Sequence, residues 1–408
     1  MTKWKSQQLS NLASITMGSS PKSTAYNDEG IGLPLIQGNA DIKNRLTKPR
    51  TYTSQITKEC APGGIIMTVR APVGAIAKST VKGCIGRGVC AISATKISQD
   101  YLYQYLISQE SKWKKLEQGS TFSAIGSKDV KQLLIAYPES VKEQAQIAGV
   151  LSTVDKKIDL IDQKIAETEK LKTGLMQKLF SEGIGVQDEN GDWQPHAEFE
   201  DNGLPMHWGF LKLGSVAKVT SGGTPSRKKA SFWENGTIPW ITTGEVNFNC
   251  ITNSSQKITD EGLKNSAAKM FPPDTILMAM YGQGQTRGRV AMLGIEASTN
   301  QACAAIICSK KLNPHFCYHY LSSQYEKIRA IGNEGSQKNL NGQIIKDILI
   351  PCPNLEEQEQ IALVLSTVDE KITLLAKQKS ETQQLKKGLM QKLLTGEWRV
   401  PVEETEAA

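Results

Sequence analysis

The sequence predicts an α+β fold in which two globular domains alternate with two long helices under an internal pseudo-two-fold symmetry. A stretch of 38 residues occurs twice, at 143–180 and 357–394, and 24 of its 38 aligned pairs are identical. The blocks before the two copies contain short apolar runs between Gly and Pro residues, as is typical of short strands in irregular sheets. The length of 408 residues also suits at least two domains.

Each copy of the repeated stretch is predicted to form one long helix. Its apolar residues recur at alternating steps of four and three, which is the period of a coiled-coil seam. No proline interrupts either copy, although Lys379 stands where the first copy has Ile165. An apolar stripe of this length needs a partner, and the simplest partner is the other copy. The residues predicted to pair the helices are Ile147, Leu151, Val154, Ile158, Ile161, Ile361, Leu365, Val368, Ile372 and Leu375.

Landmarks in the variable blocks also recur in order. Trp4, Gly18 and Pro21 in the first half correspond to Trp208, Gly222 and Pro225 in the second. Each half is therefore a variable block followed by a nearly constant one, as in an internal pseudo-dimer. The predicted segments are a globular domain at 1–140, a helix at 141–181, an acidic linker at 182–207, a second globular domain at 208–354, a second helix at 355–397, and a tail at 398–408.

Positive charge belongs to the two globular domains. Residues 1–140 hold 18 basic against 9 acidic residues, and residues 208–354 hold 16 against 9, whereas residues 181–207 hold 7 acids and no Lys or Arg. For any single residue a solubilising surface is the alternative, but the bias of both halves favours an anionic polymer as the partner. The side chains predicted to contact DNA, by phosphate or by base edge, are Lys43, Arg45, Lys48, Arg50, Arg70, Lys78, Lys82, Arg87, Arg227, Lys228, Lys229, Tyr281, Gln283, Gln285, Arg287 and Arg289.

The sequence lacks the motifs of a catalytic subunit. It has no P-loop, no complete GxGxxG and no [DNS]-PP-[YFW] methyltransferase motif. His315 and His319 stand at helical spacing with Cys317 between them, but on a helix Cys317 faces away from both, so packing is favoured over a metal site. The eight cysteines form no CxxC pair, which fits a reducing compartment. We therefore expect no metal and no cofactor on this chain.

The repeated motifs EQxxIAxVLSTVDxKI and LKxGLMQKL, with the entry HAEFEDNGLPMHWGFLKLGSVA into the second half, resemble those of the specificity subunit of a type I restriction–modification enzyme. The resemblance covers essentially the whole chain, although the variable blocks match only in layout. It implies two target-recognition domains that each read one half of a split site in double-stranded DNA. It also implies that the two long helices pack antiparallel as a coiled coil and separate the domains by a fixed distance.

The resemblance further implies the partners. The helices would dock two methyltransferase subunits, which bind S-adenosylmethionine and methylate adenine, and two motor–nuclease subunits would use ATP and Mg²⁺. A prokaryotic cytoplasmic location is expected, since the N-terminus lacks a signal-peptide core and no apolar run is long enough for a membrane span. The sequence departs from the family in one respect, because Trp4 comes almost at once where a longer lead-in is usual. The first domain is thus expected to start with little support.

Three alternatives stay open at this point. They are a methyltransferase or nuclease acting alone, a coiled-coil adaptor whose domains bind proteins, and the specificity subunit of a related modification-only system. The missing motifs weigh against the first, and the basic domains beside an acidic linker weigh against the second. Within the repeated VLSTVD, Asp155 and Asp369 have no catalytic partner in view and are expected to face solvent or a partner subunit.

Overall fold

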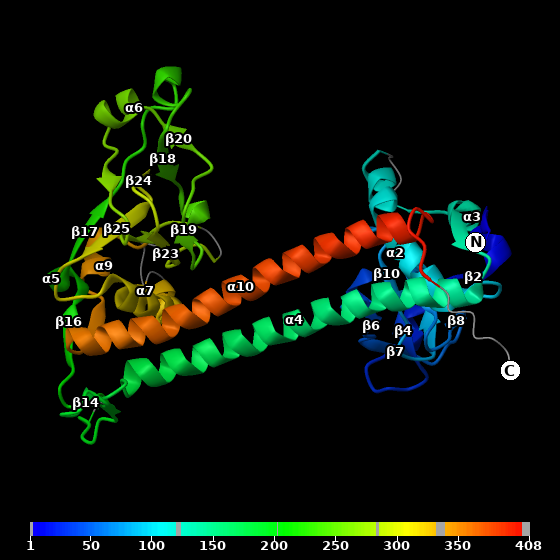
Figure 1. Cartoon of the computed structure of the whole chain (residues 1–408), viewed down its shortest axis with the longest axis horizontal. Coiled ribbons are helices and arrows are strands. Elements are labelled where there is room, and N and C mark those ends of the chain that lie inside the picture. Colours follow the sequence, from blue (N-terminus) through cyan, green and yellow to red (C-terminus); the bar gives the residue numbers. More distant parts are fainter. Residues whose placement is uncertain (1–2, 120–123, 202, 283–284, 332–338, 402–408) are drawn as a thin grey trace. The chain divides into compact units, whose positions relative to one another are not determined.

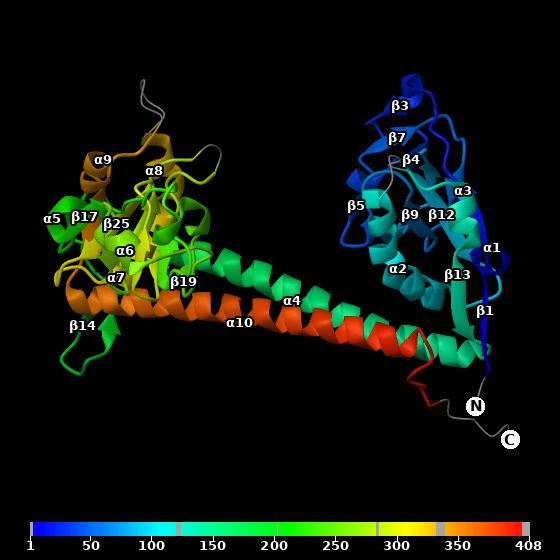
Figure 2. The same ribbon diagram turned by 90° about the horizontal axis from the view of Figure 1, so that it is seen from above.

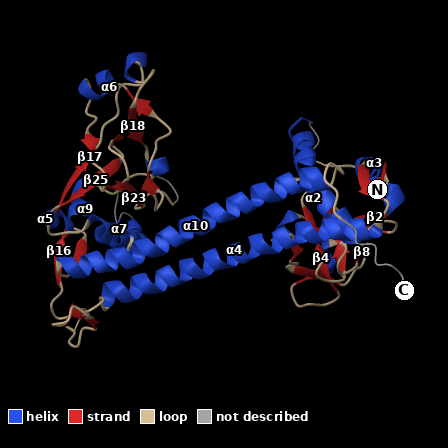
Figure 3. Ribbon diagram, viewed as in Figure 1, coloured by secondary structure: helices blue, strands red, loops and turns tan. Residues whose placement is uncertain are grey.

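The computed structural model describes residues 3–119, 124–201, 203–282, 285–331 and 339–401. The chain forms two compact units: residues 1–163 with 377–408 make the first, and residues 164–376 make the second. These units cut across the predicted linear segments, because each long helix contributes one part to each unit. Both halves combine runs of short strands with helices (Figures 1 and 3).

Two sheets and a helical layer build the first globular domain. The six-stranded sheet has the order β2-β12-β9-β10-β6-β5 and the five-stranded sheet has the order β3-β7-β4-β11-β8. The first comprises β2 (Ala13–Met17), β12 (Val89–Ala94), β9 (Ile65–Thr68), β10 (Ile76–Lys78), β6 (Leu46–Thr47) and β5 (Ile42–Lys43). The second comprises β3 (Tyr26–Asn27), β7 (Thr51–Thr53), β4 (Leu33–Ile36), β11 (Gly83–Ile85) and β8 (Glu59–Cys60). The remaining elements are β1 (Trp4–Gln8), β13 (Leu134–Pro138), α1 (Leu9–Leu12), α2 (Gln99–Gly119) and α3 (Ser127–Gln132).

The central strand β9 explains why this domain needs two layers. Ile65 and Met67 join the core that includes residues of α2, whereas Ile66 joins a second core with Ile36 and Ile85 of the five-stranded sheet. Successive side chains of a strand point to opposite faces, so an uninterrupted apolar run is buried on both. The run GIIM thus places the six-stranded sheet in the middle of the domain.

The second globular domain repeats this topology. Its strand orders β17-β25-β22-β23-β19 and β20-β18-β24-β21 match β2-β12-β9-β10-β6 and β7-β4-β11-β8. The strands are β17 (Ala217–Ser221), β25 (Cys303–Cys308), β22 (Ile276–Ala279), β23 (Val290–Leu293), β19 (Cys250–Ile251), β20 (Lys257–Ile258), β18 (Ile238–Ile241), β24 (Ala297–Thr299) and β21 (Met270–Phe271). The pair β16 (Gly209–Lys212) and β26 (Leu349–Cys352) corresponds to β1 and β13.

The helices of the second domain differ in detail from those of the first. Where the first has the single helix α2, the second has α7 (Pro314–Ser323) and α8 (Tyr325–Ile331), with Gln324 between them. Asn313 caps the start of α7 by accepting from the amides of His315 and Phe316. The other elements are α5 (Leu213–Val216), α6 (Asp260–Lys264), α9 (Gly342–Lys346) and the linker hairpin β14 (Val186–Gln187) with β15 (Trp193–Gln194).

The two repeated stretches form α4 (Val141–Ser181) and α10 (Leu355–Leu393). In the first unit, Asp155 contacts Lys386 and Asp162 contacts Lys379, at N–O distances of 2.6 and 2.5 Å. Residue numbers rise along one helix as they fall along the other, so the two helices run antiparallel within this unit, as the ribbon also shows (Figure 2). In the second unit, Lys172 of α4 contacts Asp369 of α10 at 2.5 Å.

Candidate functional site

Four basic side chains of the first domain that were predicted to contact DNA are engaged in ion pairs. Arg45 forms a two-pronged contact with Glu110, with N–O distances of 2.7 and 3.0 Å. Arg50, Lys78 and Lys82 pair with Asp41, Asp100 and Glu59. The bidentate geometry and partial burial of the Arg45 contact make it part of the domain's framework. Lys43 and Lys48 are exposed and lie in or beside the short strands β5 and β6.

Arg70 and Arg87 are placed differently. Both are exposed and line a hollow of about 220 Å³, together with Ser20, Gln37 and Asn39. The lining of this hollow contains no carboxylate. Among the described residues, neither arginine takes part in an ion pair. We call this the first-domain hollow. Its two guanidinium groups are thus not paired with an acidic side chain of the described residues.

In the second domain, Arg227 is held against aromatic rings. Its guanidinium carbon lies 3.6 Å from the ring centre of Trp233 and 4.9 Å from that of Trp240, and Nη2 donates to Gln256 Oε1 at 2.6 Å. Lys229 lies over Phe232 at 4.8 Å. Such cation–π contacts fix the direction of a charge without neutralising it. Arg227, Lys228 and Lys229 remain on an exposed loop.

Only part of the glycine-rich loop at 281–289 is free to contact DNA bases. Tyr281 is exposed, and Gln283 lies outside the described residues. Arg287 is buried and donates from Nη2 to the carbonyl of Arg329 at 3.0 Å, so it fastens the loop to α8 and does not present its charge to a groove. Arg289 donates to Asn247 and to Gln285, at 2.8 and 3.2 Å. Gln285 in turn accepts from the Tyr325 hydroxyl through its carbonyl.

The residues predicted to pair the helices differ in what they touch. Ile147, Leu151 and Ile161 of α4 and Ile361, Leu365 and Leu375 of α10 are buried, whereas Val154, Ile158, Val368 and Ile372 are half-buried. Ile147 and Leu151 belong to the core of the first domain, which also holds Met390 and Leu393 of α10. Ile361 and Leu365 belong to the core of the second domain, with Leu179 of α4. The start of each apolar stripe therefore anchors a globular domain as well as the other helix.

The acidic residue of each VLSTVD copy lies at a helix–domain junction. The side chains of Asp155 and Asp369 stay partly exposed, at 29% and 33%, as expected, but each also contacts a lysine of the other long helix. In the first junction, Asp155 accepts from Lys386 Nζ at 2.6 Å and from Gln104 Nε2 at 2.9 Å. Lys386 and Gln104 are themselves buried. Asp155 thus joins α4, α10 and the domain helix α2 at one point.

The second junction has the same plan, with histidine in place of glutamine. Lys172 contacts Asp369 at 2.5 Å, and His319 of α7 places Nδ1 at 3.8 Å from the same carboxylate. Burial lowers the pKa of His319 to about 3, and the nearby Lys172 adds to this effect. The ring is therefore neutral at neutral pH, and its contact with Asp369 is not an ion pair. Its Nε2 lies 3.2 Å from Ser366 Oγ, so His319 has the packing role that the sequence favoured.

A buried carboxylate stands near the start of each long helix. Glu357 accepts from the amides of Ile184 and Gly185, from Trp208 Nε1 and from His196 Nε2, at 2.9 to 3.1 Å. These four donors belong to the linker and to the entry of the second domain. The carboxylate thus fastens the chain that leaves α4 onto the start of α10, within the second unit.

The equivalent residue in the first unit is Glu143. It accepts from Arg399 Nε and Nη2 at 2.7 and 2.9 Å, and Arg399 lies over the ring of Trp4 at 6.0 Å. A side chain at Gly396 would also collide with that ring. The segment after α10 therefore supports Trp4 as the linker supports Trp208. The expectation that the first domain starts with little support was wrong, because the support comes from the far end of the chain.

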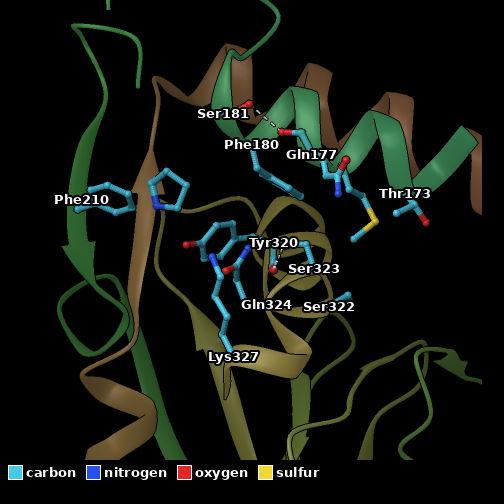
Figure 4. Close-up of a pocket in the computed structure, with 12 residues that line it drawn as sticks. Thr173, Gln177, Phe180, Ser181, Phe210, Tyr320, Ser322, Ser323, Gln324 and Lys327 are labelled. Carbon is cyan, nitrogen blue, oxygen red and sulfur yellow. Dashed lines mark hydrogen bonds between the residues drawn. The ribbon is translucent and has the colours of Figure 1, made fainter. Parts of the chain in front are cut away.

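Each unit has a groove between the last turns of a long helix and the domain helix. In the second unit the groove has a volume of about 590 Å³ and is lined by Met176, Gln177 and Phe180 of α4 and by Tyr320 and Lys327 (Figure 4). In the first unit, Met390 and Gln391 of α10 and Leu394 just after it line a groove of about 560 Å³ together with Tyr105 and Lys112. The helix positions are the same in the two copies of the repeat. The two grooves therefore occupy equivalent places in the two units.

Neither a metal cluster nor a membrane helix stands out in the described part of the chain. Within those residues, no group of three or more His, Cys, Asp or Glu side chains is placed to hold a metal ion. No helix of the described ranges combines the length and apolar character needed to cross a membrane. Asp100, Glu110 and Lys112 match the nuclease pattern of a carboxylate followed by E-x-K. In the structure, however, Asp100 pairs with Lys78 and Glu110 pairs with Arg45.

Comparison with known proteins identifies one family. A family model described as "Type I restriction modification DNA specificity domain" matches residues 1–170 and 205–384. The Type I restriction enzyme MjaIX specificity subunit of Methanocaldococcus jannaschii is 25% identical over 413 residues, which cover 97% of this chain and 94% of that one. The EcoR124I/EcoR124II specificity subunit of Escherichia coli is 30% identical over 162 residues, 38% of this chain and 40% of that relative. The alignment with this second relative thus spans less than half of either chain.

A solved structure has the same fold. The crystal structure of the S subunit of a type I restriction–modification system from M. genitalium matches with a TM-score of 0.62 at 18% identity, over 96% of both chains. At this identity the match concerns the fold alone. It agrees with the predicted α+β class and the two domains on long helices.

Proposed function

The chain belongs to the type I restriction modification DNA specificity domain family, and from this premise we propose that each of its globular domains reads one half of a bipartite DNA site. As a specificity subunit it recognises DNA and is not itself the enzyme. The observation that carries the proposal is the duplication of one sheet topology with different side chains on its loops. Two readers of one design but different surface fit two different half-sites.

The test is the methylation motif of the reconstituted complex. The chain would be combined with its methyltransferase partner and S-adenosylmethionine, and the methylated positions would be mapped on genomic DNA. We expect a motif of two short specific parts with an unspecified gap, and exchange of residues 208–354 for those of a relative should change one part only. A continuous motif, or methylation by the chain without any partner, would contradict the proposal.

We propose that the two long helices set the gap between the half-sites. A regular helix of the length of α4, 41 residues, is about 60 Å long. Antiparallel ion pairs fix the register of the helices within the first unit. A duplex repeats about every 34 Å, so a spacer of this length can hold two readers on one face of DNA.

A heptad insertion tests this spacing role. Seven residues placed after Lys164 and seven after Gln378, which are equivalent positions, preserve the seam and lengthen each helix by about 10 Å. The preferred gap should grow by about three base pairs. An insertion of four residues in one helix alone breaks the register and serves as the matched control, with weakened binding expected. If the heptad variant kept the parental gap, helix length would not set the distance between the half-sites.

We propose that the two grooves dock the methyltransferase subunits, one copy each. The support is that equivalent residues of the repeated helices line both grooves, so that one partner segment fits twice. The methyltransferase subunits would carry S-adenosylmethionine, and the motor–nuclease subunits would carry ATP and Mg²⁺. The expected location of such a DNA-reading complex is the prokaryotic cytoplasm.

Gln177→Arg and Gln391→Arg test the docking grooves. Both residues are exposed, and each substitution places a long charged side chain in one groove. Each single variant should lose one methyltransferase copy, and the double variant both, as measured from the mass of the purified complex by light scattering. Gln187→Arg and Gln132→Arg, on exposed residues outside the grooves, are the controls. Full occupancy in the double variant would exclude the grooves.

A further inference from the structure

We propose that the first-domain hollow is the base-reading site of the first domain and that Arg70 and Arg87 read guanine there. This inference rests on the proposed function, and it names the residues that read one half-site. The hollow combines two guanidinium groups with Gln37, Asn39 and Ser20, and no carboxylate lines it. Arginine offers a fixed pair of donors that matches the two acceptors of guanine in the major groove.

The hollow is formed where loops from different strands meet. Gly18 follows β2, Gly86 and Gly88 flank Arg87 after β11, and Gln37 follows β4. A Cβ at Gly18 would collide with the carbonyl of Gly86, and one at Gly88 would collide with the carbonyl of Gln37. The close approach of these loops therefore depends on glycine. It places Ser20, Gln37 and Arg87 side by side on the surface.

The second domain builds the same framework at the same place. The amide of Ser19 donates to Ile85 O at 2.9 Å, and the amide of Gly223 donates to Thr299 O at 2.9 Å. The amide of Gly86 donates to Ile36 O at 2.8 Å, as the amide of Asn300 does to Ile241 O at 3.1 Å. A Cβ at Gly222 would likewise collide with the carbonyl of Thr299. Equivalent strands, equivalent backbone bonds and an equivalent glycine define one shared loop platform.

What differs is the side chains on this platform. In the first domain, Arg87 donates from its amide to Ser20 Oγ at 3.1 Å. At the equivalent place in the second domain, Thr224 Oγ1 donates to Gln301 Oε1. Tyr281 lies two residues past the end of β22, as Arg70 lies two residues past the end of β9, and Thr242 replaces Gln37. The framework is constant while the hydrogen-bonding groups change, which is the pattern expected of a reading surface.

The charges elsewhere on the first domain point to the same place. Arg45, Arg50, Lys78 and Lys82 have carboxylate partners within the domain, at 2.6 to 3.3 Å. To bind a base, such a side chain would have to give up its carboxylate, and the uncharged edge of a base would not fully replace that interaction. Arg70 and Arg87 meet no such competition in the hollow. The second platform carries no arginine at these positions, and the amide of Gln301 suits adenine instead.

The experiment exchanges side chains between the loop platforms of the two domains and uses the assembled methyltransferase complex. Arg87→Gln and Arg70→Gln are made in the first domain and Gln301→Arg in the second, and the methylation motif of each is mapped against the parent. We expect each arginine variant to lose discrimination for guanine at one position of one half-site, by roughly 10- to 100-fold. Gln301→Arg should change the other half-site only. Lys96→Gln removes an exposed charge beyond the opposite end of β12 and should leave both half-sites unchanged.

Two further readouts separate the possible outcomes. Arg87→Lys keeps the charge but not the paired donors, so guanine discrimination should fall while total DNA affinity at fixed salt is kept. If the Arg70 and Arg87 variants bind all sequences uniformly less well with an unchanged motif, these residues contact phosphate and the inference is overturned. An unchanged motif with unchanged affinity overturns it too. Failure of the parent complex to give a bipartite motif would instead contradict the proposed function, before any variant is compared.

Discussion

The two junctions between helix and domain share a plan and differ in one member. Each joins an aspartate of VLSTVD to a lysine from the other long helix, Asp155 with Lys386 and Asp369 with Lys172. The third member comes from the variable domain and is Gln104 in one unit and His319 in the other. The repeated helices thus supply a constant attachment, and a diverging domain needs only one polar side chain to meet it.

The helix-start carboxylates show the larger contrast between the units. Glu357 accepts from four donors, two of which are backbone amides, whereas Glu143 accepts from Nε and Nη2 of Arg399, a side chain that is one-third exposed. Donors that are buried cannot turn to water when their acceptor is lost, but an arginine near the surface can. The second unit therefore depends more strongly on its carboxylate.

The largest effect is expected from Glu357→Ala compared with Glu143→Ala. We expect Glu357→Ala to lower the free energy of unfolding by about 3–5 kcal/mol and Glu143→Ala by about 1–3 kcal/mol. Urea unfolding followed by tryptophan fluorescence measures both, since Trp208 contacts Glu357 and Trp4 lies beside the Glu143 contact. Glu357→Gln keeps the shape and should lose less. Equal losses in the two alanine variants would remove the contrast.

The next effect concerns the aspartates of the junctions. Asp155→Asn removes the carboxylate that pairs with the ammonium of Lys386, which is 10% exposed. We expect a loss of about 2–3 kcal/mol there and about 1–2 kcal/mol for Asp369→Asn, because Lys172 is more exposed. The double variant Asp155→Asn with Lys386→Met should recover most of the loss in urea unfolding. No recovery would mean that the charge pair is not the cause.

A pH effect should distinguish the second junction from the first. The folded pKa of His319, about 3, lies below its ordinary value of 6.5, because burial disfavours the charged ring. The unfolded chain then binds the proton more readily, so stability is full above pH 6.5 and falls as the pH drops toward 3. The loss should reach about 2 kcal/mol at pH 5.

The test of this pH effect exchanges the variable members of the junctions. His319→Gln, which copies the first junction, should flatten the stability profile between pH 7.5 and 5 in urea unfolding. Gln104→His should steepen the profile through the first junction. Identical profiles for the parent and His319→Gln would show that another group causes the acid sensitivity.

The smallest effect is expected at Asp159. Burial raises the pKa of this carboxyl, and the neighbouring Asp155 and Asp162 raise it further. An acid with a raised pKa stabilises the fold at low pH and loses that contribution as the pH rises through the folded value. At neutral pH, Asp159→Asn should therefore raise the melting temperature by about 1–2 °C. Thr373 is the equivalent residue in the second unit, and Thr373→Asp should lower the melting temperature; a rise would contradict the explanation.

The repeat in the sequence was enough to predict the α+β class, two domains and two long helices, because apolar periodicity is a local property. The same periodicity predicted the residues that pair the helices, and most of these residues are buried. The DNA-contact candidates could not be sorted from the sequence. Arg45 and Arg87 look alike in a list of basic residues, yet Arg45 faces Glu110, 65 positions away, and Arg87 lines a hollow that contains no carboxylate.

The sequence by itself determined that one design occurs twice, and that its repeated part is helical while its variable part is mostly strand and loop. Only the tertiary structure decided what the repeated aspartates do, since their partners lie on another helix and another domain. It also decided that Arg399 and Gly396 support Trp4, although nearly the whole chain separates them. The physical reason is the same in each case: patterns along the chain report local geometry, whereas the pairing of charges and donors depends on which segments folding brings together.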